Sequence, residues 1–176
     1  MKKKKIIIAV AVCLAVVLGL TMFIMSFRTR KFTDVRKYLN AKGYMSGREA
    51  LSDDIDSMQD FRGAVRKFLI FGGTKACSFS LSEENFDAYC SYFAEKYTSS
   101  YEQYHDMKVA DIKDTNSEDD YYGFRFCDFC NDLTDKPVED YEILYFSPAS
   151  GTGGAEIGVF ADPETYSIVV CKGGSN

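Results

Sequence analysis

Residues 141–172 decide the fold, and they read "YEILYFSPASGTGGAEIGVFADPETYSIVVCK". The stretch holds three runs of β-branched and aromatic residues: YEILYFS, AEIGVFA and YSIVVCK. Turn-forming residues separate these runs, namely Pro148, the glycine-rich SGTGG and the segment ADPET. Short consecutive strands joined by tight turns pair in antiparallel fashion. The stretch therefore predicts an antiparallel meander.

Further strands are predicted upstream of the meander. KACSFSLS, residues 75–82, alternates apolar and small polar residues, which is typical of a strand with one buried face. The segments 107–114 and 121–128 are also interpreted as strands, which gives a sheet of about five or six strands. No helices separate the later strands, so a parallel βαβ arrangement is disfavoured.

One long amphipathic helix is predicted between these strands, from about residue 82 to 98. Ser80 and Glu83 have the spacing of a capping box, and Glu83 and Glu84 make the first turn acidic. An apolar stripe with spacings of three and four follows, consisting of Phe86, Tyr89, Cys90, Phe93, Tyr97, Tyr101 and Tyr104. The predicted fold class is therefore α+β, with the meander sheet packed on this helix in one domain, residues 60–176.

The N-terminal region predicts a membrane anchor. Residues 6–25 contain no charged side chain and are preceded by four lysines. Twenty helical residues span about 30 Å, the thickness of the hydrocarbon core of a bilayer. The residues that follow are too bulky for signal-peptide cleavage, so we expect the segment to stay in the chain and contact the lipid bilayer.

The sequence then divides into four parts: a basic cytoplasmic tail (1–5), a transmembrane anchor (6–27), a juxtamembrane helix with an acidic linker (28–59) and the α+β domain (60–176). The compact lysine block at the N-terminus favours a cytoplasmic tail and an extracytoplasmic domain. The basic residues on the other side, from Arg28 onward, nearly balance that block. A cytoplasm-facing, membrane-anchored structural domain therefore stays as an alternative.

Charge restricts the ligands that this domain is expected to bind. Residues 38–176 hold 12 basic and 25 acidic side chains, a net charge of −13. Such a surface repels the phosphates of nucleic acids, so nucleic acid is not an expected partner.

Cys127 and Cys130 form a Cys-x-x-Cys pair and raise the hypothesis of a thiol-disulfide redox protein. A redox pair of this kind opens a helix, whose dipole lowers the thiol pKa. Six residues separate Cys130 from Pro137, which leaves no room for a helix, and the preceding alternation indicates a strand. The remaining redox or disulfide candidates are Cys77, Cys90 and Cys171. Five cysteines follow the anchor and cannot all pair, so buried unpaired thiols are the leading interpretation.

No metal site or cofactor is predicted. Zinc needs four ligands, whereas the chain has a single histidine, His105, and no second Cys-x-x-Cys pair. The acidic stretch 111–120 lacks the glycine and glutamate of a calcium loop, and whether it binds a cation stays open. The SGTGG loop lacks the lysine of a phosphate-binding loop and runs into a strand rather than a helix.

Aromatic residues provide the remaining functional indication. The chain holds 12 tyrosines and 14 phenylalanines, more than a core of this size can cover. The candidates for a partner-facing surface are Tyr92, Tyr101, Tyr104, Tyr121 and Tyr122. Because no catalytic constellation is complete, the leading hypothesis is a non-enzymatic, membrane-anchored domain that binds an envelope protein or peptide.

Overall fold

The computed structural model of the chain describes residues 10, 12–21, 23, 28–41, 55–67, 73–113, 127–148 and 155–174. Its strands are β1 (Arg30–Phe32), β2 (Gln59–Lys67), β3 (Gly73–Ser80), β4 (Glu142–Ser147), β5 (Ala155–Asp162) and β6 (Ser167–Gly174). Its helices are α2 (Val35–Asn40), α3 (Glu83–Lys96), α4 (Thr98–Tyr104), α5 (Val109–Lys113) and α6 (Cys127–Asn131), with short 3-10 turns η2 (Ile55–Ser57) and η3 (Val138–Asp140).

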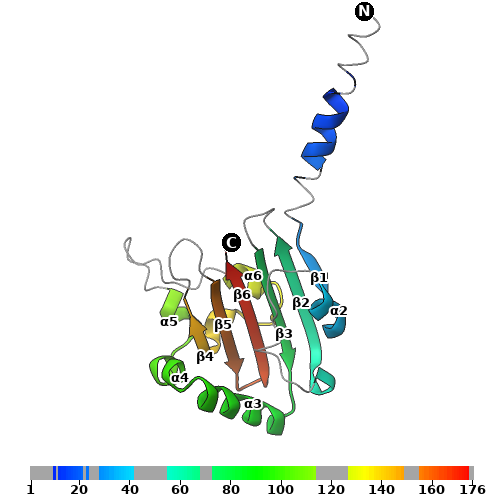
Figure 1. Cartoon of the computed structure of the whole chain (residues 1–176). Helices are drawn as coiled ribbons and strands as arrows, with labels where there is room; N and C mark the ends of the chain where they lie inside the picture. The colour runs from blue at the N-terminus through cyan, green and yellow to red at the C-terminus, as the bar shows by residue number, and fades with distance from the viewer. Residues whose placement is uncertain are drawn as a thin grey trace, which may run out of the picture.

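The six strands form one antiparallel sheet in the order β1-β2-β3-β6-β5-β4 (Figure 1). It consists of two meanders, β1-β2-β3 and β4-β5-β6, which join where β3 pairs with β6 from Ser80↔Ser167 to Gly73↔Gly174. The predicted α+β class and antiparallel sheet are confirmed.

Both faces of the sheet are covered, which the prediction of one long helix over one face missed. The β6 strand shows why, because Val169 and Cys171 join one core, which we call the first core, while Ile168 and Val170 join the other, the second core. The first core also contains residues of α5, α6 and η3, and the second contains residues of α2 and α3. Figure 1 shows α6 behind the sheet, and α3 and α4 following one another along its lower end.

The segment 107–114 was predicted as a strand, and that prediction is wrong. Residues Val109–Lys113 form α5, and only Lys108 makes a β-bridge, to Glu142. The side chain of Asp111 accepts a hydrogen bond from the Lys108 N–H at 2.7 Å, which favours the helical turn. Val109 and Ile112 are both buried in the first core, and their spacing of three is helical.

The α3 helix is present, but it begins after a different cap. Ser82, not Ser80, is the N-cap residue, and its hydroxyl accepts from the Asn85 N–H at 3.4 Å. The predicted stripe divides at Tyr97, where α3 ends. Phe86, Tyr89 and Phe93 enter the second core, whereas Tyr104 belongs to α4 and packs against the first.

Residues before position 60 also contribute to the sheet. The β1 strand pairs with β2, and Tyr38 of α2 is 3% exposed with its ring 5.4 Å from that of Phe61. Residues 30–40 are therefore part of the packed structure. Asp34 caps α2, and its side chain accepts a hydrogen bond from the Lys37 N–H at 3.0 Å.

No helix among the described residues is both long enough and apolar enough to cross a membrane. Residues 6–9, 11, 22 and 24–27 of the predicted anchor lie outside the described residues.

Candidate binding cleft

A cleft of about 220 Å³ lies where β2 begins, β3 ends and β6 begins. The segment 132–137, which follows α6, closes one side of it, and we call this segment the strap. The lining residues come from the strap, the three strand ends, the β5–β6 turn and the residue before β4: Asp60, Arg62, Ser78, Phe79, Ser80, Leu133, Thr134, Asp135, Lys136, Tyr141, Thr165 and Ser167.

Two polar contacts fasten the strap to the sheet. The Ser78 hydroxyl donates to the Leu133 carbonyl at 2.5 Å. The Arg62 guanidinium donates to both carboxylate oxygens of Asp135, at 2.7 and 3.1 Å. A two-pronged Arg–carboxylate pair fixes orientation as well as distance. The wall of the cleft is therefore held in place without a ligand.

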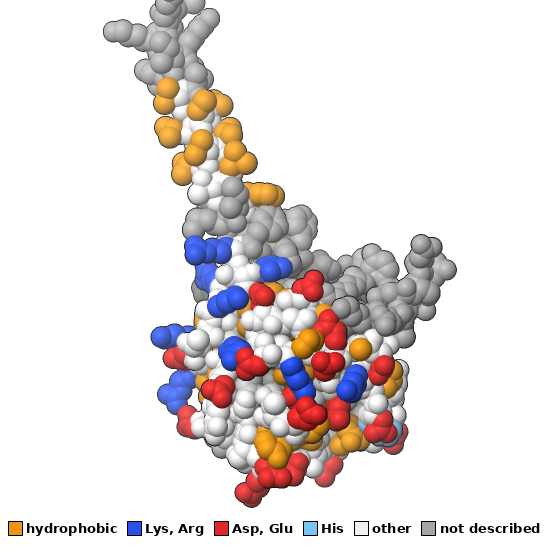
Figure 2. All heavy atoms as spheres, turned by 180° about the vertical axis from the view of Figure 1, so that it is seen from behind, with side chains coloured by type: hydrophobic (Ala, Val, Ile, Leu, Met, Phe, Trp, Pro, Cys, Tyr) orange, Lys and Arg blue, Asp and Glu red, His pale blue; other side chains and the backbone are white. Residues whose placement is uncertain are grey.

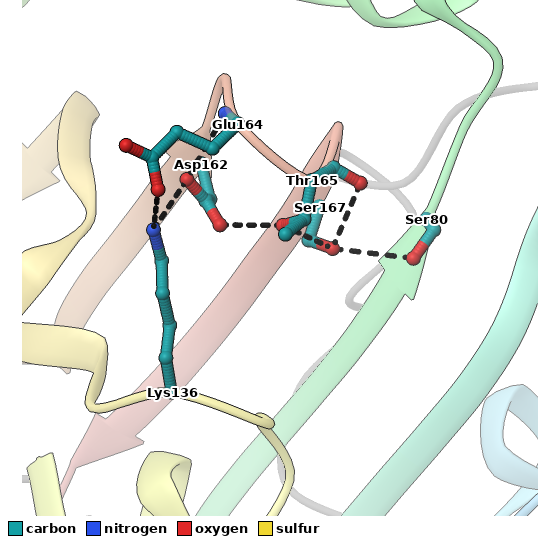
Figure 3. A network of polar contacts seen from close by, with 6 residues as sticks. All are labelled: Ser80, Lys136, Asp162, Glu164, Thr165 and Ser167. Carbon is teal, nitrogen blue, oxygen red and sulfur yellow. Dashed lines mark hydrogen bonds and ion pairs between the residues drawn. The ribbon is translucent and has the colours of Figure 1, made fainter.

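A third contact joins the strap to the β5–β6 turn (Figure 3). The Lys136 ammonium donates to Asp162 at 2.7 Å and to Glu164 at 3.2 Å. Asp162 also accepts from the Glu164 N–H at 3.2 Å and from the Thr165 hydroxyl. With a side chain only 2% exposed, Asp162 thus has donors for both oxygens. Burial alone would raise its pKa, but these donors together hold the pKa of Asp162 below its usual value.

Hydroxyl groups extend this network along the floor of the cleft. Thr165 Oγ1, whose proton goes to Asp162, lies 3.0 Å from Ser167 Oγ and can accept from it, and Ser167 Oγ lies 3.2 Å from Ser80 Oγ. Figure 3 shows the chain of contacts from Lys136 to Ser80. The Tyr141 phenol also lines the cleft, and burial raises its pKa to about 12, so it stays protonated at neutral pH.

Asp60 is the lining carboxylate without a partner, since no described residue makes a hydrogen bond or ion pair with its side chain. It lies in an irregularity of β2 between Gln59 and Arg62, with φ at 50°. A non-glycine residue rarely adopts this conformation, although Asp tolerates it better than most. The bulge therefore places an exposed, ionisable side chain at the cleft.

The hydroxyl group of Thr134, in the cleft lining, lacks a hydrogen-bond partner. Its Oγ1 is buried and, among the described residues, is the buried side-chain polar atom that lacks a hydrogen-bond partner. A buried hydroxyl without a partner is rare in folded proteins and often marks a missing water or ligand.

The cysteines proposed from the sequence as redox or disulfide candidates do not line the cleft. Cys77, Cys127, Cys130 and Cys171 are buried in the two cores, Cys90 is half-buried, and none of the described cysteines forms a disulfide. Cys127 does open a helix, α6, so the argument that no helix fits before Pro137 is wrong. Yet Cys130 is 0% exposed, and burial raises the pKa of Cys77 to about 12 and that of Cys90 to about 11.

The predicted tyrosines are dispersed. Tyr92 is 47% exposed and contacts Lys96, Tyr101 stacks on His105, and Tyr104 packs edge-on against Phe146. Tyr121 and Tyr122 lie outside the described residues, as does most of the acidic stretch 111–120. None of the predicted site residues that the structure describes lines the cleft.

Sequence reasoning missed the cleft because its residues come from four distant segments. A single local signal pointed toward it: the ADPET turn, which positions Asp162 and Thr165. The described residues contain no group of His, Cys, Asp or Glu side chains that could hold a metal ion. No protein-family model, curated protein or solved structure matches the chain.

Proposed function

We propose that this chain is a single-pass membrane protein whose non-enzymatic α+β domain lies outside the cytoplasm and binds an envelope protein or peptide in the cleft. The observation that carries the proposal is a ready-made polar cleft, lined by an exposed carboxylate without an ion pair, Asp60, and by a buried hydroxyl without a hydrogen-bond partner, Thr134, on a domain that follows an exposed apolar helix.

The helix supports the membrane part of the proposal. Residues 12–21 are helical, and large apolar side chains along this segment are more than half exposed, among them Val12, Leu14, Val17 and Leu18. Figure 2 shows such side chains along the helix. A helix that is apolar on all sides and covered by no protein is stable in a hydrocarbon environment.

The cleft supports binding rather than catalysis. The Lys136 ammonium and the Arg62 guanidinium are both engaged by carboxylates, and the Asp162 carboxylate is held by the turn that it organises. A general base needs a free acceptor beside a nucleophile. The Asp162 carboxylate is occupied, and the free carboxylate of Asp60 makes no hydrogen bond to a hydroxyl among the described residues. Because the side chains of the cleft are already paired and fixed, little ordering is needed when a ligand binds, which favours ligand binding.

The thiol-disulfide alternative is weaker. A redox cysteine needs an accessible thiolate, whereas Cys127 and Cys130 are 4% and 0% exposed. The α6 helix also has only five residues, so its dipole contributes little.

Topology is tested with an introduced cysteine, because the buried native thiols would not report it. Glu102 is exposed on α4, and Glu102→Cys places a thiol on the domain surface. We expect a membrane-impermeant maleimide to label this variant in intact cells, above the background of the unmodified chain. Labelling only after permeabilisation would place the domain in the cytoplasm, and release of the chain by alkaline carbonate would rule out the anchor.

The binding site is tested by photo-crosslinking in intact cells. A photoreactive amino acid replaces Glu164, which is 83% exposed beside the cleft, or Asn85, which is exposed on α3. We expect a discrete adduct with a protein or peptide from position 164 and none from position 85. The same adduct from both positions, or none from either, would contradict the proposed site.

A further inference from the structure

We infer that the cleft recognises a primary ammonium group, carried by a lysine side chain of the partner. This inference rests on the proposed function and names the chemistry of the group that the cleft binds.

The charges around the cleft leave a negative excess. Two cations, Arg62 and Lys136, face four carboxylates: Asp60, Asp135, Asp162 and Glu164. Asp135 holds Arg62, while Asp162 and Glu164 hold Lys136 (Figure 3). Asp60 acts on Arg62 through space, but of the four carboxylates it is the one with no hydrogen bond or ion pair to a cation among the described residues.

The neutral groups of the lining add acceptors around this carboxylate. An ammonium has three N–H donors and no acceptor, so it needs several oxygen atoms around it. Asp60 supplies a charged oxygen, and Ser80 and Tyr141 supply hydroxyl oxygens in the same cleft. The Thr134 hydroxyl lacks a partner, and rotation of this side chain would let it join them.

An anionic ligand fits these groups poorly. To bind a cation here, the anion would have to replace Asp135 as the partner of Arg62, or Asp162 as the partner of Lys136. The side chain of Asp162 is 2% exposed. A carboxylate left buried without its partner is strongly unfavourable. A cation disturbs neither pair.

The size of the cleft and the field of the whole domain agree with this assignment. About 220 Å³ accommodates one side chain rather than a large ligand. Residues 38–176 carry a net charge of −13, which attracts a basic segment of a partner from a distance.

The test is calorimetric titration of the full chain in lipid nanodiscs with blocked tripeptides. The probe is acetyl-Ala-Lys-Ala-amide, and its uncharged isostere replaces lysine with norleucine. We expect the norleucine peptide to bind at least tenfold more weakly. The lysine peptide should also bind more weakly as the salt concentration rises.

Asp60→Asn is the decisive variant, because Asn keeps the shape of the side chain and tolerates the left-handed backbone. We expect this variant to bind the lysine peptide at least tenfold more weakly than the unmodified chain does. Asp87→Asn is the matched control, since it removes one exposed carboxylate on α3 and should change affinity less than twofold.

Equal binding of the lysine and norleucine peptides, no binding of either, or tighter binding of acetyl-Ala-Glu-Ala-amide would overturn the ammonium assignment. If n-butylammonium binds more tightly than the lysine peptide, the ammonium group that the cleft recognises would not be that of a lysine side chain. In each case the crosslink from position 164 is an independent result, so the proposed function can survive failure of this inference.

Discussion

Asp162 shows how a single buried carboxylate organises the site. Its side chain is 2% exposed, and it accepts from Lys136 of the strap and from Glu164 and Thr165 of its own turn. Since these donors hold the pKa of Asp162 below its usual value of 3.8, the folded state releases this proton more readily than the unfolded state does. Its contribution to stability is thus present above about pH 4 and is lost as the pH falls through the folded-state pKa.

We expect Asp162→Asn to lower the free energy of unfolding at pH 7 by about 2 kcal/mol, the usual effect of removing a charged partner from a buried hydrogen-bonded pair. The measurement is pulse proteolysis in urea with the chain in nanodiscs. The difference from the unmodified chain should shrink as the pH falls below 4. Glu164→Gln is the control and should cost less than about 0.5 kcal/mol, because Glu164 is 83% exposed. A difference that is constant from pH 7 to pH 3 would contradict this role of Asp162.

The burial of the cysteines predicts that their thiols react slowly in the folded chain. Cys77, Cys127, Cys130 and Cys171 are buried, and burial raises the pKa of Cys77 to about 12. Because thiolates are the reactive form, these four should resist an aromatic disulfide reagent in the folded chain and react fully in urea. Mass spectrometry of the trapped thiols measures this. Rapid modification of Cys127 or Cys130 in the folded chain would revive the redox alternative.

The β5 strand depends on a glycine that the sequence does not mark as special. Gly158 and Phe160 lie two residues apart, so they share one face of the strand. The ring of Phe160 folds over Gly158, and a Cβ at this position would overlap it. Phe160 is itself 0% exposed, so it cannot move away without disturbing the core.

We therefore expect Gly158→Ala to destabilise the domain by about 1 to 3 kcal/mol through overpacking. Gly19→Ala is the control, since nothing lies within 4 Å of its added Cβ. Combining Gly158→Ala with Phe160→Leu should cost less than the sum of the two single changes, because the smaller side chain leaves room. Strict additivity in urea unfolding would show that the ring is not the cause.

The free edge of the sheet at β4 is protected by other elements. Ile143 N–H donates to the Met107 carbonyl at 3.0 Å, and the Phe146 N–H donates to the Ser100 hydroxyl at 3.3 Å. These contacts occupy the donors that would otherwise pair with another strand. A partner peptide is therefore not expected to extend the sheet at this edge, which again favours the cleft.

Elements with strong local patterns were predictable, and elements set by tertiary contacts were not. The β3 alternation and the aromatic spacing of α3 identified both elements. The α5 and α6 helices have five residues each, too short for a periodic pattern to stand out. They are fixed instead by burial of Val109, Ile112 and Phe129 in the first core.

At the scale of the whole molecule, the site could not be predicted because it depends on long-range pairing. The β3–β6 ladder brings Ser80 next to Ser167, 87 positions apart in the chain. The strap then crosses this junction and carries Asp135 to Arg62, 73 positions away. Residues of these types are common on protein surfaces, so only the fold distinguishes them.

The central claim is that the cleft under the strap is the binding site, and mapping of amide chemical shifts tests it most directly. The full chain in nanodiscs is saturated with acetyl-Ala-Lys-Ala-amide, and the shifts are compared with those of the free chain. We predict the largest changes at residues 60–62, 133–136 and 164–167. Changes concentrated on α3 and α4, with the strap unchanged, would contradict the claim.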